Sequence, residues 1–518
     1  MGKCLPARFP KRCLKRATEF NTNRTLKPTK SLNLAANNKW KVVTGLALLT
    51  LAGLLVHGYH PFAEDAEIYL PGVQKILHPE LFPVGAEFFQ SHARLTLFPN
   101  LIAFSVRLTH LPFAVVLLLW QLAAIFLLLL ACWQLSGRFF DSGRARWAAM
   151  ALVAALLTLP VAGTALYLLD QYLNPRNLAA FSGVFAVVRA LERRYVGAGL
   201  WLAFAAAMHP FMTFFAASYC ALLVLIETWK LRWPRLARRL SLALPIEGRP
   251  DPYHEASMYH SFQYLSHWAW YEWLGAIAPL GIFWGFSRLA REKNRGELER
   301  VCRAFILYNV IYFAGALVLA LPKNSERLAR FQPLRSLHLL YIVMIVIGGG
   351  FLGEYVLKNR AWRWVALFLP LGTGMFLAQR ALFPASAHVE WPWAASKNEW
   401  VQAFVWARDH TPVDGVFAMD PWTMQIPNED SNGFRCIARR SMLADAVKDS
   451  GAVTMFPALG EKWWQQVEAQ RGWKNLHPAD LERLRREFGV SWVVLEQPGV
   501  AGLDCPYENH TVRVCRLD

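Results

Sequence analysis

Apolar residues are concentrated in long blocks along this chain, and the short polar segments between the blocks carry most of the charges. A helix needs about 17–25 mainly apolar residues to cross a bilayer, and several blocks approach or reach that length. Spans are predicted at residues 42–56, 111–132, 147–168, 177–191, 196–208, 211–229, 269–286, 304–321, 334–356 and 362–379. The pattern therefore predicts an all-α polytopic membrane bundle within residues 42–385.

The distribution of Lys and Arg between these blocks predicts an orientation, because basic residues favour the cytoplasmic side of a membrane. Residues 1–41 contain eleven Lys or Arg and a single acid, so this basic segment is expected in the cytoplasm. The polar stretch before the first span is too long for a cleavable signal peptide, so that span is expected to be a retained anchor. The predicted outer segments are residues 58–110, 169–176, 322–334 and 386–518.

One interval breaks the regular alternation of sides. Between Arg194, expected inside, and residues 267–273, expected outside, the number of crossings must be odd, yet only two clear spans lie there. A short third crossing at residues 236–246 restores the parity, although Arg238 and Arg239 make it unfavourable. A broken or re-entrant helix shielded by protein is the alternative. The bundle is thus expected to contain about 10–12 transmembrane helices.

Composition agrees with a membrane protein and argues against another class. Hydrophobic residues make up 55% of the 518 residues and charged residues 18%, whereas soluble domains average about 45–50% and about 25%. The formal net charge of +18 is compatible with nucleic-acid binding. However, the basic residues lie in blocks between apolar segments, as the positive-inside pattern predicts. No nucleic acid is expected as a partner, and the lipid bilayer is.

Residues 386–518 have the composition of a small soluble domain. Residues 400–410 and 478–488 are expected to be helices, and residues 416–419 and 490–495 are expected to be strands. Helices that alternate with strands indicate a compact α/β module, which the charge pattern places outside the cytoplasm.

The cysteines give one structural expectation. The chain has eight Cys and no Cys-x-x-Cys pair, so zinc-thiolate and dithiol redox sites are not expected. Cys505 and Cys515 flank a predicted hairpin at residues 506–514. In an oxidising extracytoplasmic space they are expected to form a local disulfide.

An acidic cluster, Glu64-Asp65-Ala66-Glu67, follows the first predicted span directly and is preceded by His60. A carboxylate at the edge of a bilayer can act as a general base, or it can hold a divalent cation through its oxygens. We therefore treat Glu64 and Asp65 as catalytic candidates and as a candidate cation site, with His60 as a substrate-binding candidate. Glu67 is expected to be a solvated neighbour on the helix that follows.

Other polar residues are predicted at the same outer level. Asp170 and Arg176 lie in the second outer loop, where the alternative roles are a helix cap for Asp170 and contact with lipid headgroups for Arg176. His209 precedes a proline that interrupts an apolar block, and polar residues at membrane depth are functional candidates. Glu272 lies in an aromatic run that alternatively forms an interfacial belt.

The run at residues 321–335, which is predicted outside, departs from the positive-inside pattern. It carries Lys323, Arg327, Arg330 and Arg335 against one acid. Arg binds phosphate through paired hydrogen bonds, so these arginines are candidates for binding a lipid-linked phosphate. The alternative is that the predicted topology is wrong here and these bases face the cytoplasm.

These features together resemble the GT-C superfamily of membrane glycosyltransferases, and in particular its uncharacterised bacterial multi-pass members. The resemblance rests on the first span, the acids of the first outer loop, amphipathic stretches at residues 68–77 and 97–108, Asp170, and the outer C-terminal domain. Some members carry Asp-x-Asp where this chain has Glu64-Asp65-Ala66-Glu67, which leaves a requirement for a divalent cation open. The resemblance implies a location in the bacterial inner membrane.

The resemblance also implies a reaction, in which a sugar passes from a polyprenyl-phosphate-linked donor to an acceptor on the outer face of the cytoplasmic membrane. It implies that Asp65 is the main catalytic carboxylate, that Glu64 assists it, and that Asp170 is the second acidic contact. Arg327, Arg330 and Arg335 would bind the carrier phosphate, and residues 386–518 would cover the cavity and contact the acceptor.

Two other functions agree with the same residues. A transporter or flippase of lipid-linked or anionic substrates also needs acids and arginines at membrane level, although the related halves common in transporters are not evident in this sequence. A non-catalytic scaffold that keeps the GT-C architecture is the second alternative.

Overall fold

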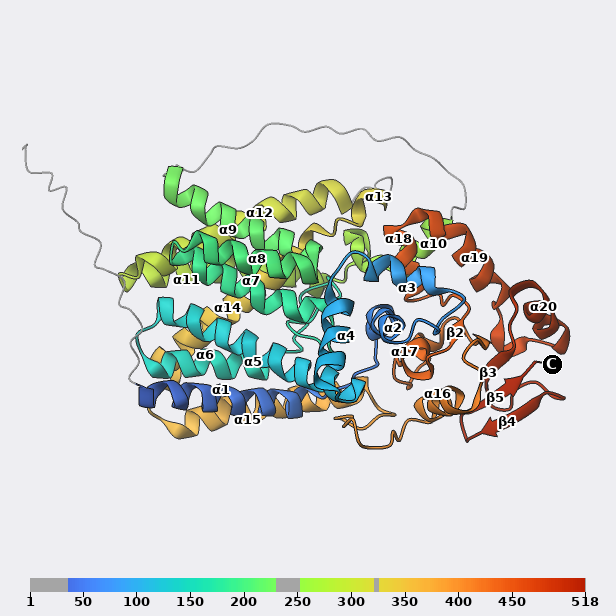
Figure 1. Cartoon of the computed structure of the whole chain (residues 1–518). Helices are drawn as coiled ribbons and strands as arrows, with labels where there is room; N and C mark the ends of the chain where they lie inside the picture. The colour runs from blue at the N-terminus through green and yellow to red at the C-terminus, as the bar shows by residue number, and fades with distance from the viewer. Residues whose placement is uncertain (1–35, 230–251, 321–325, 518) are drawn as a thin grey trace, which may run out of the picture. The chain divides into compact units, whose positions relative to one another are not determined.

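The computed structural model describes residues 36–229, 252–320 and 326–517 of the chain. The chain divides into two compact units, Met1–Gly45 and Leu46–Asp518. The described residues are mostly helical, with one small sheet near the C-terminus (Figure 1). This confirms the predicted combination of a helical part and a small C-terminal α/β part. The predicted crossing at residues 236–246 lies outside the described residues.

Six helical segments of the described chain are long and apolar enough to cross a membrane. They are Lys39–His57 in α1 (Ala36–His57), α5 (Phe113–Phe139), Pro210–Thr228 in α9 (Pro210–Trp229), Gly296–Leu319 in α12 (Gly296–Ala320), Pro333–Leu357 around α14 (Leu337–Phe351), and α15 (Ala361–Leu382). The α14 segment is buried on nearly all sides, whereas α15 is almost entirely exposed.

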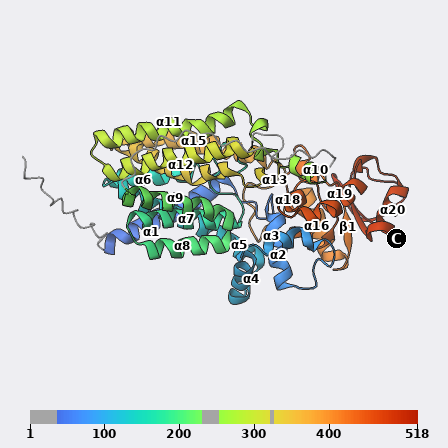
Figure 2. The same cartoon turned by 90° about the horizontal axis from the view of Figure 1, so that it is seen from above.

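Shorter helices pack between the long ones. Helix α7 (Pro175–Leu191) is buried along its length and contacts α5, α9 and α8 (Tyr195–Met208). Figure 1 shows these helices side by side, and Figure 2 shows α12 beside α11 (Trp270–Glu292). A helix buried on all sides needs apolar or small residues on every face, which explains the weak amphipathic pattern of α7.

The predicted span at residues 147–168 is wrong in its second half. Helix α6 (Gly143–Ala155) ends at Ala155, and residues 156–174 form turns with an isolated bridge between Pro160 and Tyr167. Pro160 has no N–H to continue a helix, and a proline ring clashes with the preceding turn. The break matters because this irregular segment carries Asp170.

The segment after α1 folds into three short helices. They are α2 (Ala66–Leu77), α3 (Ala86–Ala93) and α4 (Phe98–Thr109). Helices α2 and α4 confirm the amphipathic stretches predicted at residues 68–77 and 97–108, whereas α3 was not predicted. Helix α2 packs against both α3 and α4 and also against α17 (Phe434–Ala438) of the C-terminal part.

The C-terminal part is built on a five-stranded sheet in the order β2-β1-β3-β5-β4. Strands β1 (Val416–Ala418), β2 (Ser441–Met442) and β3 (Trp492–Glu496) are parallel, while β4 (Asp504–Glu508) and β5 (Val512–Arg516) are antiparallel to their neighbours. The disulfide between Cys505 and Cys515 joins β4 to β5, as predicted.

The predicted helices of this part are present as α16 (Glu399–His410) and α20 (Pro478–Phe488). Pro478 occupies the first turn of α20, and Gly489 ends it at φ 70°. Proline at the start and glycine just past the end are strong local signals, which is why the predicted bounds agree with the structure. Helices α18 (Asp449–Met455) and α19 (Gly460–Ala469) pack against α10 (Pro252–Met258).

Glu67 is buried, so the prediction of a solvated side chain is wrong. Its Oε1 accepts a hydrogen bond from Arg435 N (2.9 Å) and its Oε2 accepts one from Cys436 N (3.1 Å). The Arg435 guanidinium, 1% exposed, lies 3.6 Å from Glu67 Oε1 and donates two hydrogen bonds to Asp449 (3.0 and 2.7 Å). This buried ion cluster joins α2 to α17 and α18, so it fixes the C-terminal part against the helices.

Replacing Arg435 by Ala is expected to lower the free energy of unfolding by about 3–5 kcal/mol, because Glu67 and Asp449 remain buried without their cation. The loss is measured as a lowered melting temperature of the detergent-solubilised full chain. Arg408→Ala is the matched control, since the Arg408 and Asp409 side chains are 35% and 48% exposed and exposed pairs contribute about 0–1 kcal/mol. Equal effects of the two substitutions would contradict the role of the buried cluster.

Candidate functional site

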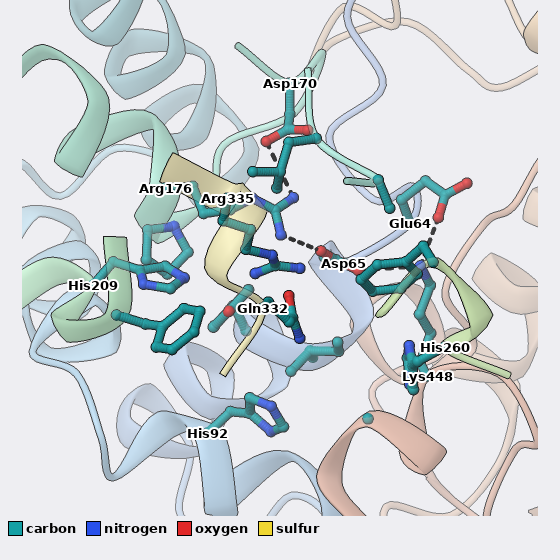
Figure 3. Close-up of a pocket in the computed structure, with 18 of the residues that line it drawn as sticks. Glu64, Asp65, His92, Asp170, Arg176, His209, His260, Gln332, Arg335 and Lys448 are labelled. Atoms are coloured by element: carbon teal, nitrogen blue, oxygen red, sulfur yellow. Dashed lines mark hydrogen bonds and ion pairs between the residues drawn. The ribbon is translucent and has the colours of Figure 1, made fainter. Parts of the chain in front are cut away.

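A cavity of about 1150 Å³ lies where the helices meet the C-terminal part. Its wall contains residues from the start of α2, from α3, from the irregular segment before α7, from the α8–α9 junction, and from α18 (Figure 3). Most of the residues selected from the sequence are in this wall. They are Glu64, Asp65, Asp170, Arg176, His209, Arg330 and Arg335.

Arg176 joins the two predicted acidic positions. Its Nη1 donates to Asp65 Oδ2 (2.7 Å) and its Nη2 donates to Asp170 Oδ2 (3.2 Å). Arg176 and Asp170 are both buried, and the Asp65 side chain is 23% exposed. One guanidinium therefore fixes two carboxylates from segments more than a hundred residues apart in the sequence.

Local sequence explains how Arg176 is placed. Asn174 caps α7, since its Oδ1 accepts from Asn177 N (3.1 Å), and Pro175 occupies the first turn. Asn174 Nδ2 also donates to Asp170 Oδ2 (2.6 Å). Gln121 from α5 donates to the Asp170 carbonyl (2.7 Å). The segment that carries Asp170 is thus held by hydrogen bonds to side-chain amides. These bonds take the place of the backbone hydrogen bonds that a helix or strand would form.

Lys448, which the sequence did not single out, reaches into the acidic cluster. Its Nζ lies 2.6 Å from Glu64 Oε2 and 3.1 Å from Asp65 Oδ1. Asp445 positions this lysine, because its Oδ1 accepts from the backbone N–H groups of Val447 (2.7 Å) and Lys448 (2.6 Å). The cation therefore comes from the C-terminal part, immediately before α18.

The backbone at Glu64 is in the left-handed region, with φ 55°, which is unfavourable for a residue other than glycine. Glu64 N donates to Ser431 O (2.8 Å), which holds this conformation against the C-terminal part. Strained backbone of this kind is common at functional sites and costs on the order of 1–3 kcal/mol.

The charge of Asp65 is set by opposing effects. Burial disfavours the ionised carboxylate, but Lys448 and Arg176 outweigh burial and hold the pKa of Asp65 well below its usual range. Asp65 is therefore a fixed negative charge at neutral pH, and it does not accept a proton there. This side chain can stabilise a developing positive charge, but it is a weak base.

Arg335 is a cation whose charge is not matched by a neighbouring acid. Among the residues that the structure describes, no carboxylate forms an ion pair with it, and its buried Nε has no hydrogen-bond partner. Its guanidinium lies 5.8 Å from the ring centre of Phe262. Figure 3 shows Arg335 beside Arg176 in the cavity, close to Gln332, whose φ is 40°. This arrangement is suited to an anion.

Three histidines also line the cavity: His92 from α3, His209 before α9, and His260 after α10. His209 Nδ1 accepts a hydrogen bond from Met212 N (3.3 Å) at the start of α9. Because Nδ1 is the acceptor, the proton of the neutral ring is on Nε2. His209 therefore offers a hydrogen-bond donor at the cavity wall.

The cavity wall also includes apolar side chains that reach the protein surface. Five of them are between 44% and 61% exposed, namely Leu95, Phe214, Phe331, Leu382 and Met455. Apolar residues this exposed along a cavity wall are unusual on a surface that faces water. They fit contact with acyl or isoprenyl chains.

Three predicted residues are not placed in the cavity wall. His60 is fully buried behind it, stacked on Phe383 with ring centres 3.7 Å apart and with Nδ1 3.4 Å from Glu390 Oε2. Glu272 accepts from Ala269 N (2.7 Å) and so caps the start of α11. Arg327 belongs to α13 (Glu326–Ala329), and its side chain lies outside the described part of the chain.

The arrangement does not fit the divalent cation that the sequence allowed at Glu64 and Asp65. The Lys448 ammonium contacts both carboxylates, and Arg176 takes the other oxygen of Asp65. Within the described residues, no group of three His, Cys, Asp or Glu side chains is placed to hold a metal ion. The Lys448 ammonium occupies the position where the sequence allowed a divalent cation.

Comparison with known protein families found no match, and comparison with curated proteins found none either.

Removing Lys448 is expected to create a cation requirement that the unsubstituted protein lacks. In Lys448→Ala, Glu64 and Asp65 face each other without their ammonium, so the melting temperature should fall and should recover when millimolar Mg²⁺ or Ca²⁺ is added. The unsubstituted chain should be insensitive to EDTA. Lys462→Ala, which removes an exposed partner of Glu87, is the control and should show no cation response. EDTA sensitivity of the unsubstituted chain would contradict this assignment.

Proposed function

We propose that this protein is a membrane glycosyltransferase that moves a sugar from a polyprenyl-phosphate-linked donor to an acceptor. The observation that carries the proposal is the composition of one cavity, whose wall combines fixed carboxylates, an unmatched arginine and exposed apolar side chains. A lipid-linked sugar phosphate has the three complementary parts, which are a sugar, an anion and a long hydrocarbon chain. The resemblance of the sequence to the GT-C superfamily supports the same reading.

In this proposal the chain spans the bacterial inner membrane about ten times or more. Helices α6, α7, α8 and α11 lie in the bilayer with the six long apolar segments. The N-terminus is cytoplasmic, and the cavity and residues 386–518 are on the opposite side. The exposed apolar residues of the cavity wall then face lipid, so the polyprenyl chain reaches the cavity directly from the membrane.

Each charged group has its own role in the proposed reaction. Arg335, with Arg330 on the same wall, binds the carrier phosphate and stabilises the negative charge that grows on it as the sugar leaves. Asp65 is the fixed anion that stabilises the positive charge developing on the sugar ring. Asp170 holds Arg176, and Glu64 holds Lys448, so each keeps a cation in place beside Asp65.

The acceptor would approach from the C-terminal part. Val447, Lys448 and Gly451 of that part line the cavity, and Ser431 does so as well. An acceptor covered by this wall is partly shielded from water, which limits hydrolysis of the donor.

Asp65→Asn is expected to reduce sugar transfer by about 100-fold or more, because removing one preorganised charge typically costs that much. Transfer is measured with purified full chain in proteoliposomes, using labelled sugars on polyprenyl phosphate and pyrophosphate carriers. Glu80→Gln is the control, since Glu80 is 60% exposed on the same segment. Transfer retained by Asp65→Asn would contradict its role, and uptake of donor without transfer would favour a transporter.

Arg335→Gln is expected to weaken binding of a polyprenyl phosphate by about 10–100-fold, because a hydrogen bond to a charged group contributes about 1.5–3 kcal/mol. Binding of a radiolabelled polyprenyl phosphate to the detergent-solubilised chain gives the dissociation constant. Arg360→Gln, at an exposed arginine before α15, should leave it unchanged. Equal weakening by both variants would show nonspecific attraction and contradict the site.

A further inference from the structure

Transfer to a hydroxyl or amine acceptor requires that the acceptor lose a proton, and the fixed carboxylate of Asp65 is poorly suited to take it. Its two oxygens are engaged by Arg176 and Lys448. Asp170 is engaged as well, since its Oδ2 accepts from both Asn174 and Arg176. Glu64 is paired with Lys448, so each of these three acids is held in an ion pair. A neutral side chain at the cavity wall is better suited to accept the proton.

We propose that His260 is the general base for the acceptor, and that Ser450 positions it. The assignment rests on the proposed glycosyl transfer, and it adds a residue and a role that the acidic cluster does not supply. His260 lies between α10 and the short turn Ser261–Gln263, and its ring lines the cavity on the same side as Lys448 (Figure 3).

The hydrogen bonds of Ser450 determine which nitrogen of His260 carries the proton. Ser450 Oγ lies 2.7 Å from Val447 O, and two oxygens at that distance repel unless a proton lies between them. The hydroxyl therefore donates to Val447 O. His260 Nε2 lies 3.2 Å from the same Oγ, so Oγ accepts and Nε2 must be the protonated nitrogen.

The consequence is an unprotonated Nδ1 on a ring that lines the cavity. No hydrogen bond reaches Nδ1 from any residue in the described part of the chain. The ring is held in place by Ser450 and by an edge contact with Phe262 (ring centres 5.6 Å apart). Gly451 leaves room for it, since a Cβ at that position would lie 3.2 Å from His260 Nε2. A base needs such a fixed, unoccupied lone pair.

His260 and His209 thus have opposite hydrogen-bonding roles at the same cavity. His209 accepts through Nδ1 and offers an N–H, which suits an oxygen of the sugar or phosphate. His260 donates through Nε2 and offers a lone pair, which suits the proton of an acceptor hydroxyl. Figure 3 shows them on opposite sides of Arg335.

Burial, together with the nearby positive charge of Lys448, keeps His260 neutral at physiological pH. The groups that face it are Lys448 before α18, Asp65 at the start of α2, Arg335 before α14, and His92 of α3. Burial and the positive charge of Lys448 lower the pKa of His260 to about 4, although Asp65 opposes them. The free lone pair is therefore available above about pH 5, and it is lost as the pH falls through that pKa.

The proposed step balances as follows for a hydroxyl acceptor. The acceptor oxygen forms a bond to the anomeric carbon while its proton moves to His260 Nδ1. The bond between that carbon and the phosphate oxygen breaks, and its electron pair stays on the carrier phosphate, which Arg335 binds. His260 then releases the proton to water through the open cavity, which restores the neutral ring.

The role is tested on the full chain in proteoliposomes with the most active of the polyprenyl-linked donors. His260→Gln is expected to lower kcat by about 100-fold or more while binding of polyprenyl phosphate is unchanged, since general bases contribute about 10²–10⁴-fold. In the unsubstituted chain, kcat should fall below pH 5 as His260 becomes protonated. The residual activity of His260→Gln should not show this fall. Ser450→Ala should give a smaller loss with the same pH dependence, and His254→Gln, at an exposed histidine of α10, should have no effect.

A second readout does not depend on transfer. In ¹⁵N-histidine NMR spectra, the signal missing from His260→Gln should belong to a neutral ring protonated on Nε2 at pH 7. A ring protonated on Nδ1, or unchanged kcat in His260→Gln, would overturn the assignment of His260 while leaving the proposed function intact. Absence of transfer by the unsubstituted chain with every donor would overturn the proposed function and the role of His260 with it.

Discussion

The position of Asp65 between two cations is the constraint on which the rest of the site depends. Arg176 comes from the buried helix α7, and Lys448 comes from the C-terminal part, so this carboxylate is shared by two regions that are distant in the sequence. The same arrangement neutralises an acid that would otherwise be costly to bury, since an unpaired charge in a protein interior is strongly unfavourable. It also removes Asp65 from the list of groups that can exchange a proton near neutral pH.

The contact between the helices and the C-terminal part has two layers with different properties. One layer is the buried cluster of Glu67, Arg435 and Asp449, which does not line the cavity and which holds the two regions together. Glu64, Asp65 and Lys448 form a second cluster that is open to the cavity. Helix α2 begins at Ala66, between Asp65 of the open cluster and Glu67 of the buried cluster. A shift of the C-terminal part would therefore move Lys448 and change the electrostatic environment of Asp65. The C-terminal part thus contributes directly to the site.

Sequence reasoning succeeded where the signal is local. The helix predicted at residues 478–488 is α20, and the flanking cysteines marked the β4–β5 hairpin. It also selected Asp65, Asp170, Arg176 and Arg335, because unusual charges beside apolar blocks can be recognised in the sequence itself. It failed at residues 147–168, where an apolar composition hid the break at Pro160. It failed at Glu67 as well, whose partner Arg435 lies 368 positions away.

The residues that were missed share a different property. Lys448 and His260 stand in ordinary polar surroundings, and only the fold brings them to the acidic cluster. The most direct test of the proposed function is a cryo-electron microscopy map of the protein in lipid nanodiscs with a bound polyprenyl phosphate. Phosphate density is expected against Arg335, within the cavity that contains Asp65, with the hydrocarbon chain leaving past Phe214 and Phe331. Phosphate bound elsewhere, or a cavity filled by the C-terminal part, would contradict it.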